Sequence, residues 1–257
     1  MIEYTSIELM ICAAARALEN GRTVAVGTGI PCATAMLAQR THAPDLVIMF
    51  EAGGMAPQLP TMPISVGDSR TFFRGVMATS MADIMQLGQR GMIDYTFLGG
   101  AQIDAYGNLN STIAGSYDKP SVRFPGSGGA NDLASFCWRT MVVTQQNARR
   151  FVEKLDYITT PGYLTGPGAR EDAGLPPGAG PYRVITDLAI LGYADDNKRM
   201  QVLSLHPGVT LDQVRAATGF RLEVAPALEQ TEPPSLAELR ILREEVDPGR
   251  VILGRPC

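Results

Sequence analysis

The sequence has 257 residues, of which 45% are hydrophobic and 19% are charged, and its formal net charge at pH 7 is −4. A chain of this length suits one large domain or two small ones, and it can bury a substantial core. The mild acidity and the lack of a Lys/Arg run argue against binding to nucleic acid. No apolar stretch approaches the ~20 residues of a membrane helix, and Glu3 and Glu8 argue against a signal peptide.

Cysteine and histidine give no sign of a metal centre or a disulfide framework. The four cysteines are far apart in the sequence: Cys12, Cys32, Cys137 and Cys257. They form no CxxC pair and no Cys/His ligand spacing, so we expect free thiols in a reducing cytoplasm. A His-based triad or metal site would have to use His42 or His206, and the residues around them do not suggest one. We therefore expect no metal.

The first fifty residues alternate between helical and strand patterns. Thr5 and Glu8 have the spacing of a capping box, and Gly21 stands where a helix C-cap would be. The predicted elements are a helix at 5–20, a strand at 23–26, a helix at 32–41 and a strand at 45–51. This alternation predicts an α/β fold with a parallel sheet and covering helices.

The rest of the chain continues the α/β pattern. We expect helices at 80–90, 132–137, 210–218 and 235–245, and strands at 94–98, 141–144, 182–187 and 200–205. The Pro/Gly-rich stretch 161–181 is long for an internal loop, which indicates a functional excursion or a wrap over a partner. No repeat or flexible linker divides the sequence, so we predict a single domain spanning residues 1–257.

Glu51 and three glycine-rich loops are the candidate chemical groups. Glu51 ends an apolar strand, and ligands of open parallel sheets bind beyond the carboxyl ends of strands. The loops lie at 27–31, 99–108 and 126–131, where backbone N–H groups can hold an oxyanion. A carboxylate facing such groups can act as a nucleophile on an activated acyl group. By spacing alone, a capping or salt-bridged glutamate and ordinary turns remain open.

Several common catalytic and nucleotide-binding motifs are absent, and some other residues allow two interpretations. There is no phosphate-binding P-loop, HExxH motif or GxSxG elbow, and the dinucleotide-binding glycine spacing is incomplete. Trp138 is expected in the core or at an interface. Arg149 and Arg150 indicate either a surface pair or attraction to phosphates. Four methionines have near-helical spacing and indicate core packing or an acyl pocket: Met77, Met81, Met85 and Met92.

Long ordered stretches of the sequence resemble one family. The matching segments include 24–31, 51–53, 65–68, 98–104, 106–112, 123–131, 149–151, 154–157, 160–162, 218–220 and 242–249. In these segments the chain resembles class I CoA-transferases, and within that family the β subunits of the glutaconate CoA-transferase type. The resemblance covers nearly the whole chain, so it is far more specific than any short motif.

The resemblance implies a fold, a partner and a site. The implied fold is an open, mostly parallel α/β sheet with helices on both faces, of the CoA-transferase / NagB-RpiA-like type. The implied partner is a homologous α subunit in an α2β2 heterotetramer. Coenzyme A is implied as substrate and covalent intermediate, with no tightly bound cofactor. Glu51 is implied as the catalytic nucleophile, and the implied oxyanion and CoA-binding residues are Gly128, Gly129, Ala130, Asn131, Gly99, Gly100 and Gln102.

The resemblance leaves the reaction partly open. Ala52 stands where relatives often carry Ser or Asn, and residues 54–56 also differ, so the donor acyl-CoA and the acceptor acid are not defined. The expected activity is transfer of CoA between an acyl-CoA and a carboxylic acid. A dicarboxylic acid is one class of acid that fits this activity. One alternative is a CoA-thioester hydrolase or a decarboxylase of the same fold, chemistry associated with loss of the glutamate. Another is a non-catalytic binding subunit.

Overall fold

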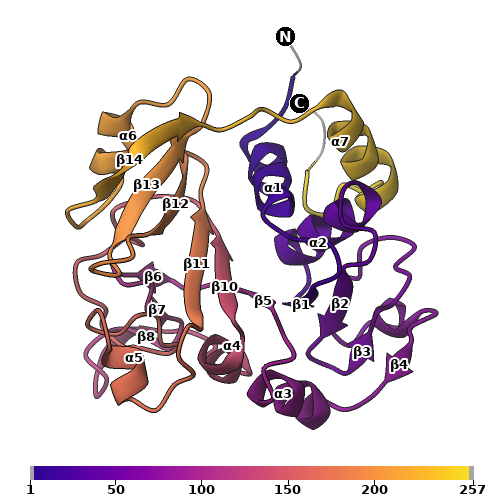
Figure 1. The fold of residues 1–257 in the computed structure, drawn as a ribbon, viewed down its shortest axis with the longest axis horizontal. Coiled ribbons are helices and arrows are strands. Elements are labelled where there is room, and N and C mark those ends of the chain that lie inside the picture. Colours follow the sequence, from indigo (N-terminus) through magenta and orange to yellow (C-terminus); the bar gives the residue numbers. More distant parts are fainter. Residues whose placement is uncertain (1–2, 255–257) are drawn as a thin grey trace. The chain divides into compact units, whose positions relative to one another are not determined.

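The computed structural model describes residues 3–254, and the chain divides into two units (Figure 1). The first unit contains the chain up to Phe97 together with the segment from Glu232 onward, and the second is Leu98–Thr231. Each unit is described separately below, and the single domain expected for residues 1–257 stays a prediction. Among residues 3–254, no helix combines the length and apolar character that crossing a membrane requires.

The sheet of the first unit has a parallel centre and an antiparallel edge. Its strands are β1 (Thr23–Val26), β2 (Val47–Phe50), β3 (Gly54–Met55), β4 (Met77–Ala78) and β5 (Tyr95–Leu98). β1 pairs in parallel with β2 and with β5, whereas β3 is antiparallel to both β2 and β4. The strands expected at 23–26, 45–51 and 94–98 are confirmed within a few residues. β3 and β4 were not predicted, because two residues are too short to show a period.

In the first unit, the helices that begin at Ser6 and Leu236 each follow a hydroxyl capping residue, whereas the helix expected at 32–41 begins two residues earlier, at Ile30. They are α1 (Ser6–Arg16), α2 (Ile30–Arg40), α3 (Met81–Gln89) and α7 (Leu236–Ile241), with a 3-10 turn at Ser69–Phe72 and a π-helical turn at Leu242–Val246. Thr5 and Glu8 form the expected capping box. The C-cap expected at Gly21 is wrong, since α1 ends at Arg16. The N–H groups of Ala17 and Leu18 close that end on the carbonyls of Ala14 and Ala15.

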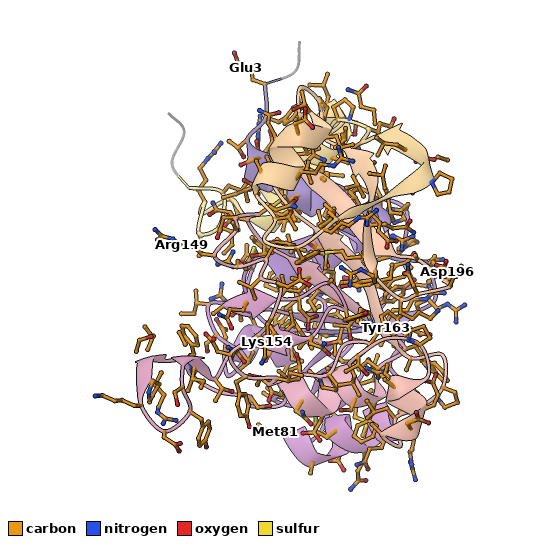
Figure 2. All side chains as sticks on the ribbon, turned by 90° about the vertical axis from the view of Figure 1, so that its left-hand side faces the viewer. Glu3, Met81, Arg149, Lys154, Tyr163 and Asp196 are labelled. Atoms are coloured by element: carbon orange, nitrogen blue, oxygen red, sulfur yellow. The ribbon has the colours of Figure 1, made fainter. Side chains whose placement is uncertain are left out.

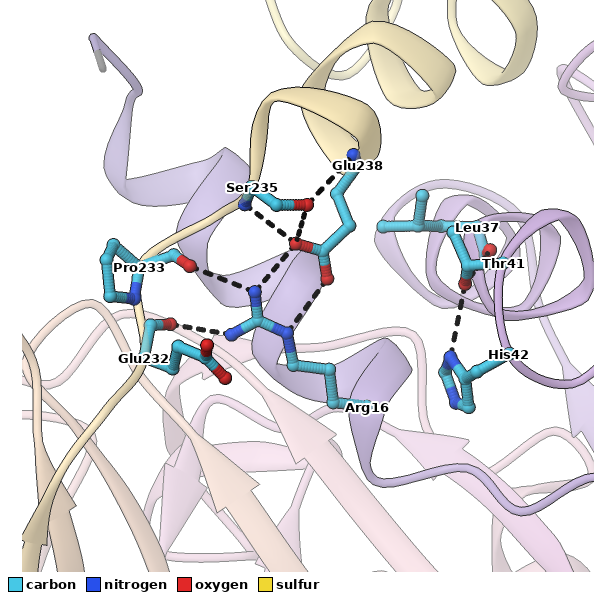
Figure 3. A network of polar contacts seen from close by, with 8 residues as sticks. All are labelled: Arg16, Leu37, Thr41, His42, Glu232, Pro233, Ser235 and Glu238. Atoms are coloured by element: carbon cyan, nitrogen blue, oxygen red, sulfur yellow. Dashed lines mark hydrogen bonds and ion pairs between the residues drawn. The ribbon is translucent and has the colours of Figure 1, made fainter.

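An arginine network holds the C-terminal segment to α1 within this unit (Figure 3). Arg16 donates from Nε to Glu238 Oε1 at 2.8 Å and from Nη2 to Glu238 Oε2 at 2.7 Å. It also donates to the carbonyls of Glu232 and Pro233 at 2.6 and 2.9 Å. Ser235 and Glu238 form the capping box that starts α7, at the beginning of the helix expected at 235–245. The same carboxylate therefore caps one helix and binds another, which fixes the return of the chain.

The second unit contains a mixed sheet. Its strands are β10 (Arg139–Val143), β11 (Gly180–Ile185), β12 (Ala189–Tyr193), β13 (Met200–Leu205) and β14 (Glu223–Gln230). β10 is parallel to β11 and β13 is parallel to β14, whereas β12 is antiparallel to both of its neighbours. The strands expected at 141–144, 182–187 and 200–205 are confirmed, and β12 and β14 were not predicted. Buried Phe151, Leu191 and Val202 belong to the core of this unit.

Short elements complete the second unit. They are the hairpins β6 (Gln102–Ile103) with β7 (Leu109–Asn110) and β8 (Ile113–Gly115) with β9 (Pro120–Arg123), and the helices α4 (Ala130–Phe136), α5 (Ala169–Asp172) and α6 (Leu211–Ala216). The helices expected at 132–137 and 210–218 are confirmed. The stretch 161–181 contains α5 and packs on its own unit, because Arg170 is only 2% exposed. Its contact with a partner stays a prediction.

Several side chains are placed differently from the expectation. Met77, Met81 and Met92 are about half exposed, so core packing is wrong for these three, and only Met81 and Met85 share a helix. The side chain of Met81 lies at the surface (Figure 2). Trp138 is 40% exposed, so a core position is wrong for it. Near-helical spacing misled here because residues 77 and 92 lie outside the helix that the spacing implied.

The expected free thiols are confirmed for the three cysteines in the described part of the chain, whereas the reducing cytoplasm stays a prediction. Cys12, Cys32 and Cys137 are free and buried, and burial raises the pKa of each to about 12. Thiols with such pKa values are almost wholly protonated at neutral pH and are poor nucleophiles. Cys257 lies outside the described residues.

Candidate active site

Glu51 is the first residue after β2, at the carboxyl end of that parallel strand. The chain turns directly after it, and the N–H of Gly53 donates to the carbonyl of Phe50 at 2.8 Å. Glu51 itself is only partly buried, in contrast to the fully buried Ile48 and Phe50 that precede it. The strand thus ends by presenting a carboxylate at the edge where ligands of parallel sheets bind.

Two glycines fix the turn that carries Glu51. Gly53 has φ +109°, and a Cβ atom added there would lie 2.0 Å from the carbonyl oxygen of Thr79. A Cβ added at Gly54 would lie 2.0 Å from the carbonyl oxygen of Thr71. The N–H of Thr79 also donates to the carbonyl of Gly53 at 2.9 Å. Only glycine permits this close backbone approach, so the turn is held against residues 71–79.

The carboxylate of Glu51 is not used by its own unit. Among the described residues of the first unit, no hydrogen bond or ion pair involves this carboxylate. Other carboxylates of the unit are engaged, for example Glu8 with Arg243 at 2.6 Å and Glu238 with Arg16 at 2.7 Å. A helix-capping or salt-bridged role for Glu51 therefore finds no support within this unit.

In the second unit, the loop 126–131 is fastened at both ends. At the start, Gly126 donates its N–H to the carbonyl of Ser111, and Ser111 Oγ donates to the carbonyl of Gly126, both at 2.9 Å. At the other end, Asn131 Nδ2 donates to the carbonyl of Thr159 at 2.9 Å. The N–H of Asn131 donates to Ser127 Oγ at 3.1 Å.

The middle of this loop is open. Gly128 has φ +50°, and nothing lies within 4 Å of a Cβ added there. Within the described part of the second unit, the N–H groups of Gly128 and Gly129 donate to no acceptor, whereas Ala130 donates to the carbonyl of Ser127 at 2.9 Å. Of the four residues predicted in this loop, Gly128 and Gly129 offer free donors. Ala130 and Asn131 use theirs to shape the loop.

Residues 99–102 of the second predicted loop, 99–108, are held by contacts within their own unit. Gln102 Oε1 accepts from Asn110 Nδ2 at 2.7 Å and from the N–H of Asp156 at 3.1 Å, and Gln102 Nε2 donates to Asp156 Oδ2 at 2.9 Å. A Cβ at Gly100 would lie 3.1 Å from the carbonyl oxygens of Asn110 and Gln102. Gly99 has open space around it. Gln102 is thus largely engaged by its own fold.

Residues that sequence reasoning missed join these two loops. Thr159 Oγ1 accepts from the N–H of Ser111 at 2.8 Å and lies 2.7 Å from Thr112 Oγ1. Asn110, which binds Gln102, also accepts the N–H of Thr112 at 2.9 Å. The segment 110–112 therefore connects loop 99–102 with loop 126–131. No spacing signal could reveal this link, because Thr159 lies far from both loops in the sequence.

The structure gives little support to the other candidate binding features. Among residues 3–254, no group of three or more His, Cys, Asp or Glu side chains could hold a metal ion. A hollow of about 450 Å³ lined by Arg40, Asp45 and Gln58 lies near the start of β2, at the opposite end from Glu51. Arg149 projects from the surface (Figure 2), whereas Arg150 donates to the carbonyl of Gln145 at 3.2 Å.

Comparison with known proteins identifies the family. The family model described as coenzyme A transferase matches residues 7–217, most of the chain. The chain belongs to the coenzyme A transferase family. It is 40% identical to the B-type subunit of glutaconate CoA-transferase from Acidaminococcus fermentans, over 98% of this chain and 96% of that protein. It is 39% identical to the B-type subunit of 3-oxoadipate CoA-transferase from Pseudomonas knackmussii, over 95% of this chain and 94% of that one.

Solved structures agree with the expected fold. The crystal structure of glutaconate coenzyme A-transferase from Acidaminococcus fermentans matches with a TM-score of 0.93 at 39% identity, covering 99% of each chain. The decarboxylase AibA/AibB matches with a TM-score of 0.82 at 26% identity, covering 96% of this chain and 97% of that one. The predicted α/β fold and the predicted transferase family are confirmed. One fold also serves a different reaction in the second relative.

Proposed function

We propose that this chain is the catalytic β-type subunit of a heteromeric CoA-transferase that works through a glutamyl-CoA thioester on Glu51. The observation that carries the proposal is the position of Glu51. It follows a parallel strand of a CoA-transferase fold, in a glycine-fixed turn, and its carboxylate has no hydrogen-bond or ion-pair partner among the described residues of its unit. Coenzyme A is the substrate, as the family requires.

The proposed chemistry begins with an attack by the Glu51 carboxylate on the thioester carbonyl of a donor acyl-CoA. The N–H groups of Gly128 and Gly129 stabilise the negative oxygen of the tetrahedral intermediate. The CoA thiolate leaves, and a mixed anhydride joins Glu51 to the acyl group. The thiolate then attacks the Glu51 carbonyl, which releases the donor acid and leaves a Glu51–CoA thioester. An acceptor carboxylate reverses these steps, so one thioester replaces another and no ATP is consumed.

The other predicted residues take supporting roles in this proposal. Ala130 and Asn131 shape the oxyanion loop, and Gln102 with Gly100 supports it through Asn110. Gly99, with open space around it, lets CoA approach the backbone. Binding energy from the distant parts of CoA would bring the reacting atoms together.

The proposed partner is a homologous α subunit, in an α2β2 heterotetramer. Both similar CoA-transferase chains are named as one type of subunit within a larger enzyme, and the present chain covers nearly all of each. An exposed apolar edge adjoins the turn of Glu51, where Val76 is 86% exposed and Met77 50% exposed on or beside edge strand β4. Edge strands with apolar side chains are rarely left uncovered in soluble proteins. The buried free thiols favour a cytoplasmic location.

The test is the intact mass of the chain, purified with its co-expressed partner and exposed to a panel of acyl-CoAs. We expect a borohydride-sensitive CoA adduct on Glu51, which is absent in Glu51→Gln and present in Glu153→Gln, a matched change at an exposed glutamate. Acyl-CoA consumption without any adduct and without an acceptor acid would support the hydrolase or decarboxylase alternative. Unchanged turnover in Glu51→Gln would support a non-catalytic role for the chain.

A further inference from the structure

Arg170 is the largest fully buried side chain of the described residues, and no acidic group binds it. It lies on α5, and 2% of the residue is exposed. Nη1 donates to the carbonyls of Pro161 and Gly162 at 3.1 and 2.8 Å. Nη2 donates to the carbonyls of Ala134 and Ser135, both at 3.2 Å. The two terminal nitrogens of the guanidinium thus bind two different backbone segments.

A buried cation with only neutral acceptors is an unusual arrangement. Desolvation penalises the charged form and lowers the pKa of Arg170, and burial of a charge is costly unless many hydrogen bonds compensate it. Arginine suits this position because its rigid, planar fork directs donors in fixed directions, which lysine cannot do. Its four hydrogen bonds to backbone carbonyls therefore hold the two segments at a set distance, and an apolar side chain would leave those carbonyls without these donors.

One of the two segments is itself anchored. The N–H of Gly162 donates to Asn108 Oδ1 at 2.7 Å, and that of Leu164 donates to the same oxygen at 3.1 Å. A Cβ at Gly162 would lie 2.3 Å from the backbone carbon of Gly107, so the two backbones are in direct contact. Asn108 Nδ2 also donates to Asp104 Oδ2 at 2.8 Å. The segment 161–164 is consequently a fixed platform.

The other segment leads to the open donors. Ala134 and Ser135 belong to α4, a helix of seven residues that starts at Ala130, directly after Gly128 and Gly129. In so short a helix, the position of its last turn determines the position of its first. Gly129 caps α4 without a side-chain hydrogen bond, so the start of the helix depends on tethers elsewhere. The Asn131 contact with Thr159 is one such tether, and Arg170 supplies another.

We propose that Arg170 is a positioning residue, which holds α4 on the 161–162 platform and so fixes the N–H groups of Gly128 and Gly129 for the oxyanion. This inference rests on the proposed function, because it assigns a reaction step to those two groups. Such donors accelerate a reaction only when they are in place before charge develops. Loss of Arg170 should therefore slow formation of the Glu51 adduct while leaving binding of acyl-CoA nearly unchanged.

The test compares Arg170→Met and Arg170→Lys with wild type in the co-expressed complex, with rapid-mixing intact-mass measurement of adduct formation. The amplitude, which is the fraction of the chain that forms the adduct, measures how many active sites are assembled. The rate of adduct formation at saturating acyl-CoA measures how well the oxyanion donors are positioned. We expect Arg170→Met to slow this rate by about ten-fold or more at an amplitude near that of wild type, with acyl-CoA half-saturation within about two-fold. Arg170→Lys should recover part of the rate, since one ammonium reaches only one pair of carbonyls.

Arg16→Met is the matched control. Arg16 also donates to two backbone carbonyls, but it belongs to the first unit, whereas α4 belongs to the second. Its loss should lower thermal stability without changing the adduct rate. An unchanged rate in Arg170→Met, or loss of the assembled complex in both Arg170 variants, overturns the positioning role. If the wild type itself forms no adduct, the proposed function fails instead, and the inference about Arg170 falls with it.

Discussion

Replacement of Gly53 by alanine should damage the turn of Glu51 more than any comparable change nearby. At φ +109°, a side chain is strained by about 1–3 kcal/mol. The added Cβ would also lie 2.0 Å from the carbonyl oxygen of Thr79, and overpacking of this kind costs about 1–3 kcal/mol more. The two terms sum to about 2–6 kcal/mol. For a chain of this size, we expect a fall in Tm of at least about 5 °C.

Calorimetry or near-UV circular dichroism of the assembled protein measures this change. Gly27→Ala is the matched control, because nothing lies within 4 Å of a Cβ there and no positive φ is required. Its Tm should stay within about 2 °C of wild type. A Tm for Gly53→Ala that equals the control would refute the close approach of Gly53 to Thr79. It would also remove the physical reason for a fixed Glu51 turn.

Three further predictions concern buried polar groups. Burial lowers the pKa of His206 in the folded protein, so as pH falls the unfolded chain binds a proton at this histidine before the folded protein does. The contribution of neutral His206 to stability is therefore complete above pH ~6.5 and declines below it. Tm measured from pH 7.5 to 5.5 should show this slope, and His206→Gln should flatten it. Cys12, Cys32 and Cys137 should resist alkylation in the native protein and react after denaturation, as peptide mapping would reveal. Asp247 accepts three backbone N–H groups at 2.8–3.0 Å, so Asp247→Asn should lose about 1–3 kcal/mol; an unchanged Tm would contradict this.

Local signals predicted several helix starts and many of the strands, but not β12 or the eight-residue strand β14. Thr5, Ser235 and Thr210 each cap a helix where a hydroxyl side chain precedes an apolar period. The ends of the helices were less predictable. α1 stops at Arg16 although apolar residues continue to Leu18, because hydrogen bonds of Ala17 and Leu18 tighten the last turn. Such closure depends on neighbouring backbone and leaves no sequence period.

Strands of two residues and antiparallel pairings could not be predicted from periodicity. β3 exists because Gly53 and Gly54 let residues 71–79 approach the end of β2, which is a tertiary effect. β12 follows β11 through a short turn, in which Thr186 Oγ1 accepts the N–H of Ala189 at 2.9 Å. The alternation of helix and strand in the first fifty residues suggested parallel strands only. The chain already departs from this alternation at β3, and again at the hairpins β6–β7 and β8–β9.

The candidate site was predictable in its exposed groups and not in its supports. Glu51 and the loop 126–131 stand out because a carboxylate ends an apolar strand and glycines cluster. Asp156 and Thr159 show no such pattern, since their roles arise from contacts with residues 40 or more positions away. Arg170 was hidden for the same reason. In a Pro/Gly-rich stretch an arginine is normally exposed, and only the structure reveals its four carbonyl partners.

On the proposed mechanism, Glu51 rather than the fold would discriminate between transfer and its alternatives. The chain matches a CoA-transferase with a TM-score of 0.93 and a decarboxylase with 0.82, so the same backbone accommodates both reactions. A glutamyl-CoA thioester needs a carboxylate that attacks the acyl-CoA carbonyl and is then itself attacked by the CoA thiolate, whereas hydrolysis or decarboxylation needs no such covalent intermediate. The Glu51 carboxylate, which has no partner among the described residues of its unit and lies in a turn that excludes side chains at Gly53 and Gly54, would meet the first requirement. Detection of the Glu51–CoA adduct would therefore decide between transfer and the alternatives.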